Sequence, residues 1–241
     1  MDHFSRAEGT PLLDFLLALP MLLFALVAHE FAHGWVAHSQ GDDTAYKLGR
    51  LTLNPIPHID PFLTLILPVL LWVGSNGAFT FGGAKPVPIN PRNFRNYRRG
   101  DILTSGAGVV TNALLAVVCT LLFILVGWLH QLSGGLGTST ANAAQQMLTY
   151  GVMINCVLAV FNLIPIPPLD GSRLFYHLLP PALGARYRSL DRFGFAILLV
   201  LMLLGKGLIT TLLTPAYWSA EHLLALANPF AVAAAADIFQ P

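Results

Sequence analysis

Two histidines and a glutamate stand close together near the start of the chain, in the run Ala28-His29-Glu30-Phe31-Ala32-His33. On a helix, positions i and i+4 lie on the same face, so the imidazoles of His29 and His33 can share one metal ion. Glu30 follows the first of them directly, where a carboxylate can accept a proton from a metal-activated water. The spacing therefore indicates a hydrolytic zinc site.

A catalytic zinc needs a third protein ligand and one open position. The best candidate is Asp170, which follows the proline-rich stretch 161–169. Irregular backbone is tolerated at membrane depth where it lines a protein cavity, so this break can aim Asp170 at a metal. Aspartate is also a favoured helix N-cap, and Asp170 precedes an apolar run. The residues alone leave ligand and cap about equally weighted.

The composition indicates a membrane protein. The 241 residues are 55% hydrophobic and only 10% charged, whereas an average soluble domain has about 25% charged residues. Because ionisable residues inside a span are rare and usually functional, a histidine–glutamate cluster there needs a partner such as a metal. A polar cluster between helices is the structural alternative, and a transporter or channel with an ion path through the cluster is the functional one. The net charge of +1 gives no reason to expect a nucleic acid.

Six apolar segments predict helices, at 12–39, 61–74, 102–130, 144–164, 193–205 and 207–227. Since a span takes about 20 residues, we expect an all-α polytopic membrane protein with about five to six transmembrane helices. Segment 61–74 is short and contains prolines, so it is expected to be re-entrant or buried. The glycines and prolines near 78–90 predict a short β-hairpin or re-entrant region. We expect a single domain over 1–241, with a catalytic core at about 12–180 and C-terminal helices at 193–227.

Basic residues predict the orientation. The stretches 75–101 and 165–192 carry five and four of them, whereas 131–143 carries no charge. The positive-inside rule then assigns the first two stretches to the cytoplasm and the third to the outside. Asp170 follows an inward span, so the active site is expected towards the cytoplasmic side. The N-terminus does not look like a cleavable signal peptide, so segment 12–39 is expected in the mature protein.

Two motifs resemble those of the site-2 protease family of intramembrane zinc metalloproteases, in the compact form without a PDZ or CBS domain. They are His29-Glu30-Phe31-Ala32-His33 and Asn162-Leu163-Ile164-Pro165-Ile166-Pro167-Pro168-Leu169-Asp170-Gly171. The similarity continues through 51–55, 58–61 and 84–92. It covers residues 20 to 180, and two motifs of this length in this order are specific.

The resemblance implies one Zn²⁺ per chain, held by His29, His33 and Asp170, with Glu30 as the general base. It also implies that Asn162 contacts the substrate backbone.

A further family element, A-G-P-x-x-N, implies a place for Asn112 beside the active site, where we expect it to bind substrate together with Asn162. Here it is Ala107-Gly108-Val109-Val110-Thr111-Asn112, with valine in place of the proline.

The activity implied is hydrolysis of peptide bonds in or near transmembrane helices of membrane proteins, as in regulated intramembrane proteolysis. The expected partners are transmembrane segments of substrates and the lipid bilayer, with no nucleic acid. The expected location is a bacterial or archaeal cell membrane, and the sequence leaves the oligomeric state open.

Overall fold

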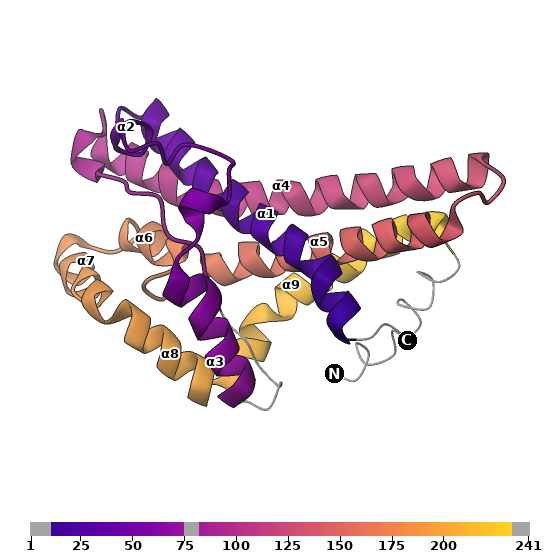
Figure 1. Ribbon diagram of the computed structural model, residues 1–241. Helices are drawn as coiled ribbons and strands as arrows, with labels where there is room; N and C mark the ends of the chain where they lie inside the picture. The colour runs from indigo at the N-terminus through magenta and orange to yellow at the C-terminus, as the bar shows by residue number, and fades with distance from the viewer. Residues whose placement is uncertain (1–10, 75–81, 233–241) are drawn as a thin grey trace. The chain divides into compact units, whose positions relative to one another are not determined.

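The computed structural model describes residues 11–74 and 82–232, and within these ranges the chain is helical, without a strand (Figure 1). The α-helices are α1 (Pro11–Ser39), α2 (Thr44–Lys47), α3 (Leu67–Gly74), α4 (Tyr97–Leu132), α5 (Thr138–Leu163), α6 (Asp170–Tyr176), α7 (Pro181–Arg188), α8 (Gly194–Leu204) and α9 (Lys206–Ala227). Shorter helical turns lie at Ile56–His58, Pro61–Ile66, Pro91–Asn93, Asp191–Phe193 and Asn228–Phe230.

Three of these helices are long and apolar enough to cross a membrane. They are Leu13–Ser39 in α1, Tyr97–Leu132 in α4 and Thr138–Leu163 in α5, which contain 18-residue stretches with mean hydropathies of 2.0, 2.7 and 1.5. They correspond to the predicted segments 12–39, 102–130 and 144–164. Three of the five to six predicted spans therefore have a matching long apolar helix in the part of the chain that the structure describes, and the full number is not confirmed.

The other predicted segments form shorter or separate helices. Segment 61–74 is helical, with a π-helical turn over Pro61–Ile66 that continues into α3. The C-terminal segments form two helices, α8 with 11 residues and α9 with 22. Gly205 separates them, and a Cβ at this position would come within 2.6 Å of the Leu201 carbonyl oxygen. The chain can therefore break here because this residue is glycine.

The expected hairpin near 78–90 has no counterpart among the described residues. Positions 78–81 lie outside them, and residues 82–90 form no strand. Pro86 and Pro88 have no N–H to give to a ladder. Other partners bind the backbone instead, since Arg50 donates to the carbonyls of Lys85 and Pro86, and the Lys85 N–H donates to the carbonyl of His58.

The contacts within the chain define two units. The first comprises Met1–Ala25, Asn112–Asn162 and Val200–Pro241, and the second comprises Leu26–Thr111 and Leu163–Leu199. Both units are built from separate pieces of sequence, and α1, α4 and α8 each contribute residues to both.

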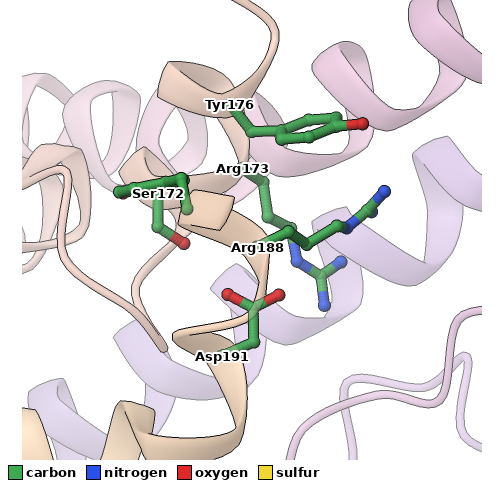
Figure 2. A pocket seen from close by; sticks show the side chains of 6 residues that line it. Ser172, Arg173, Tyr176, Arg188 and Asp191 are labelled. Carbon is green, nitrogen blue, oxygen red and sulfur yellow. The ribbon is translucent and has the colours of Figure 1, made fainter. Parts of the chain in front are cut away.

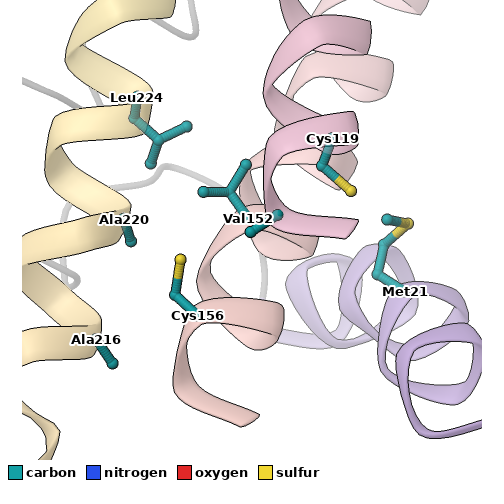
Figure 3. Packing of buried hydrophobic residues seen from close by; sticks show 8 residues of the cluster. Met21, Cys119, Val152, Cys156, Ala216, Ala220 and Leu224 are labelled. Carbon is teal, nitrogen blue, oxygen red and sulfur yellow. The ribbon is translucent and has the colours of Figure 1, made fainter. Parts of the chain in front are cut away.

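The first unit has an apolar cluster with small side chains (Figure 3). Its buried members come from α1, α4, α5 and α9 and are Met21, Ala116, Cys119, Val152, Cys156, Ala216, Ala220 and Leu224. A Cβ at Gly151 would come within 2.8 Å of the Cys119 sulfur. Small residues let helix backbones approach closely, which is how helices associate where no hydrophobic effect drives them together. Both cysteines of the cluster, Cys119 and Cys156, are free and buried.

Candidate metal centre

Two histidines of α1 and one aspartate of α6 converge in the second unit. The Nε2 atoms of His29 and His33 are 3.0 Å apart. The Oδ2 atom of Asp170 lies 3.2 Å from the first and 3.1 Å from the second. Within the described residues these are the only three metal-ligating side chains that cluster in this way. The i and i+4 spacing on α1 explains why both imidazoles reach the same point.

The three donor atoms suit a zinc ion. Tetrahedral zinc with bonds of about 2.0–2.1 Å needs ligand atoms about 3.3 Å apart, close to the observed separations of 3.0–3.2 Å. Two imidazole nitrogens and a carboxylate oxygen also form one of the ligand sets of catalytic zinc. The Asp170 Oδ2 atom is buried and has no hydrogen-bond partner of acceptable geometry, although two nitrogens lie near it. An oxygen in this environment fits a shared metal ion.

A tight loop brings Asp170 into the cluster. Asp170 is the first residue of α6, and Leu169 takes the N-cap position. A Cβ on the next residue, Gly171, would come within 2.7 Å of the Ile164 carbonyl oxygen and closer still to that of Leu163. Only glycine lets the backbone fold back this closely on the residues that precede the loop. In the Leu-Asp-Gly sequence, Gly171 is therefore required for the packing of the loop, and Asp170 supplies the carboxylate.

The carbonyl of Thr104 fixes the tautomer of His33. This oxygen lies 2.7 Å from His33 Nδ1, and a carbonyl can only accept, so Nδ1 carries the proton and donates it. The lone pair then remains on Nε2, the atom that lies near His29 and Asp170. An outer partner of this kind orients a metal-binding histidine and raises its basicity. His33 is thus held in the form that binds a metal.

Close packing of α4 on α1 positions the other histidine. A Cβ at Gly108 would come within 2.6 Å of both ring nitrogens of His29. Gly108 and Thr104 are one turn apart on α4, as His29 and His33 are on α1. The absence of a side chain at residue 108 therefore makes the space in which the His29 ring lies.

Glu30 is held by the extended segment 82–90. Its Oε2 accepts a hydrogen bond of 2.7 Å from the backbone N–H of Val87. A carboxylate has about four lone-pair sites, so one such bond leaves capacity for a proton. The side chain is only partly buried, unlike the two histidines, which are each 7% exposed.

Asp42 anchors the same segment a few residues further on. It is fully buried and accepts hydrogen bonds from the backbone N–H groups of Thr44 and Asn90, the Thr44 hydroxyl and the Asn93 amide. Burial by itself raises the pKa of Asp42, but these hydrogen bonds outweigh it and leave the pKa below its ordinary value. The charged form of Asp42 therefore fastens residues 90–93 to the turn after α1.

The two asparagines predicted to contact substrate lie in the first unit. Asn112 is fully buried, and its amide donates to the Asn155 side chain at 2.8 Å and to the Ala25 carbonyl at 3.5 Å. It thus connects α1, α4 and α5. Asn162 is partly buried near the end of α5 and donates to the Leu158 carbonyl at 3.0 Å.

The sequence did not identify three residues that support the cluster, namely Thr104, Gly108 and Val87. Two of them act through the backbone, as acceptor and donor, and their side-chain type carries no signal. Gly108 lies in the element Ala107–Asn112. A glycine inside a helix often has a packing reason, but the sequence does not separate Gly108 from Gly106, whose Cβ would meet no atom within 4 Å.

Comparisons with known proteins show which proteins this chain is similar to. A protein of Bacillus subtilis (strain 168), named "Putative zinc metalloprotease YwhC", is 38% identical over 193 residues, which are 78% of this chain and 83% of the relative. The chain belongs to peptidase family M50. The sequence model of that family matches residues 127–205, which include Asp170. No solved structure matches the chain.

Other relatives of this M50 peptidase carry similar names. "Putative zinc metalloprotease Rip2" of Mycolicibacterium smegmatis is 29% identical over 78% of this chain and 67% of the relative. "Zinc metalloprotease RasP" of Geobacillus kaustophilus is 33% identical over 31% of this chain and 20% of the relative. The resemblance to the site-2 protease family is thereby confirmed. The chain is a zinc metalloprotease with a Zn²⁺ cofactor, and three helices among its described residues are able to cross a membrane.

Proposed function

We propose that this M50 peptidase is an intramembrane protease that cleaves peptide bonds in or near transmembrane helices of other membrane proteins. In this proposal His29, His33 and Asp170 hold one zinc ion, and Glu30 is the general base. The observation that carries it is the triangle of three donor atoms separated by 3.0–3.2 Å, two of which stand on the apolar helix α1.

Bound zinc supplies Lewis acidity, which lowers the pKa of a water towards about 7 and polarises a carbonyl. Glu30 accepts the proton of the attacking water and later returns it to the leaving amine. The Val87 N–H holds the Glu30 carboxylate in a fixed direction. Thr104 keeps His33 in the required tautomer, with its Nε2 unprotonated. A substrate helix must unwind locally, because a helical peptide keeps its carbonyls in hydrogen bonds.

We further propose that Asn162 and Asn112 contribute to substrate binding. Partial exposure of Asn162 supports direct contact with a peptide. Asn112 is fully buried between α1, α4 and α5, which supports an indirect contribution through the positions of these helices.

We infer that one catalytic domain extends over 1–241, with its core at about 12–180 and its C-terminal helices at 193–227. The two units share α1, α4 and α8, which supports this view because neither unit can be separated from the other along the chain. We also propose an active site towards the cytoplasmic side, which the basic stretches 75–101 and 165–192 support. A part in regulated intramembrane proteolysis is proposed from the resemblance to the site-2 protease family.

Cleavage in a defined membrane tests this function. The purified chain is reconstituted in liposomes with zinc and a panel of single-pass transmembrane segments that contain helix-destabilising residues. We expect the wild type to cleave at least one of them and Glu30→Gln to be slower by roughly 10²–10⁴-fold, the usual contribution of a general base. Glu221→Gln, in α9, is the matched control and should cleave like the wild type. Equal rates for Glu30→Gln and the wild type would remove Glu30 from its role.

A further inference from the structure

The loop that carries Asp170 has few backbone bonds of its own. Three of the six residues 164–169 are prolines, which have no N–H to donate. Within the loop the N–H of Ile166 donates to the Ile164 carbonyl at 2.8 Å, and the N–H of Leu169 donates to the Ile166 carbonyl at 2.9 Å. A segment with so few donors needs support from its neighbours to hold a metal ligand within a few tenths of an ångström.

Helix α7 supplies this support through Tyr187. The Tyr187 hydroxyl donates a hydrogen bond of 2.8 Å to the carbonyl of Pro165, five residues before Asp170. The ring also packs edge-on against Phe175 of α6, with 5.5 Å between the ring centroids. Burial, and after it the nearby Asp191, raises the pKa of Tyr187, so the phenol stays protonated and able to donate.

Arg188, the next residue of α7, holds this helix against α6 and the start of α4. The guanidinium of Arg188 lies 4.6 Å from the centre of the Tyr176 ring, at the end of α6 (Figure 2). One of its nitrogens donates to the Tyr97 hydroxyl of α4 at 2.6 Å, and another lies 3.9 Å from Asp101. Asp101 in turn is 2.8 Å from His177, and both are almost completely buried. These polar contacts join α7 to α6 and to the start of α4.

The other side of the loop meets α8. A Cβ at Gly194, the first residue of α8, would come within 3.0 Å of the Pro168 nitrogen and 3.1 Å of the Pro167 carbonyl carbon. The loop therefore lies between the Tyr187 hydroxyl of α7 and the glycine backbone at the start of α8. Of these two contacts, the Tyr187 hydrogen bond is the one that a substitution, Tyr187→Phe, can remove with little change in side-chain volume.

We propose that Tyr187 is a positioning residue for the zinc site, which acts through the Pro165 carbonyl to hold the Asp170 loop in the geometry that binds zinc. This inference rests on the proposed role of Asp170 as a zinc ligand. Tyr187 does not touch the donor atoms, and its effect passes through the loop. Loss of the Tyr187 hydroxyl therefore weakens zinc binding only in a chain that still has Asp170 as a ligand.

A double-mutant cycle on zinc affinity tests the proposal. The zinc dissociation constant of the purified full chain is measured by competition with a chromophoric chelator for the wild type, Tyr187→Phe, Asp170→Ala and the double variant. We expect Tyr187→Phe to weaken zinc binding roughly three- to tenfold, the range of one neutral hydrogen bond. The double variant should bind no more weakly than Asp170→Ala alone. Tyr46→Phe is the matched control, since Tyr46 is 63% exposed in α2, and should bind like the wild type.

Two results would overturn the inference. One is zinc affinity of Tyr187→Phe equal to that of the wild type. The other is an equal loss from Tyr187→Phe in the presence and in the absence of Asp170, which is the behaviour of a general structural contact. If Asp170→Ala itself binds zinc like the wild type, the proposed ligand set fails, and that outcome is distinct from a failure of Tyr187 alone.

Discussion

At the scale of single residues, the chemistry depends on which atoms face the donor triangle. The Thr104 carbonyl leaves the lone pair of His33 on Nε2, and the Val87 N–H holds the Glu30 carboxylate. Both contacts are made by backbone groups. Most substitutions of Thr104 or Val87 would keep these backbone groups. Of the three residues found to support the cluster, Gly108 is therefore the one that a change of side-chain size can test.

A methyl group added at Gly108 would collide with the His29 ring, because the Cβ would lie within 2.6 Å of both ring nitrogens. We expect Gly108→Ala to displace His29 and to weaken zinc binding by roughly 10–100-fold, as for the loss of an outer-shell partner. The measurement is the zinc dissociation constant of the purified variant.

Gly106 provides the matched control on the same helix. A Cβ at this position meets no atom within 4 Å, so Gly106→Ala should bind zinc like the wild type. An unchanged affinity in Gly108→Ala would show that α4 and the His29 ring can move apart without loss of the metal site, and would contradict a positioning role for Gly108.

At the scale of elements, the spacing and apolar length of residues within one segment predicted the helices well. The spacing of His29 and His33 is a property of one helix, so their convergence followed from the sequence alone. Apolar length likewise predicted α1, α4 and α5 to within a few residues at most boundaries. The start of α5 was the larger miss, since the helix begins at Thr138 where the apolar run begins at 144. Polar residues can extend a helix beyond its apolar part, and hydropathy does not report them.

Contacts between distant segments were harder to predict. From the residues alone, Asp170 was equally a ligand or a helix cap, and the structure has Leu169 at the N-cap position with Asp170 beside the histidines. Segment 82–90 was expected to contribute to a hairpin, yet its partners are the side chains of Glu30, Asp42 and Arg50. These partners lie 35 to 57 residues away in sequence, and no periodic pattern records such contacts.

At the scale of the whole molecule, the charge distribution predicts which loops face which side of the membrane. We expect a cysteine in place of Arg186 to be cytoplasmic and one in place of Leu136, which is 76% exposed, to be outside. In intact cells a membrane-impermeant maleimide should then label Leu136→Cys alone, and permeabilisation should add Arg186→Cys.

The wild type is the control for this labelling, because Cys119 and Cys156 are buried. Labelling of Arg186→Cys in intact cells would reverse the proposed orientation. It would leave the donor triangle unaffected, since that triangle does not depend on the direction of the spans.

The central claim is that His29, His33 and Asp170 together hold the zinc of this M50 peptidase. The most direct measurement is the zinc content of the purified chain after dialysis at a fixed free zinc concentration. We predict about one zinc per chain in the wild type and in the control Asp43→Ala, whose side chain is 47% exposed and pairs with His38, and far less in Asp170→Ala. Retention of the full zinc content by Asp170→Ala would contradict the claim.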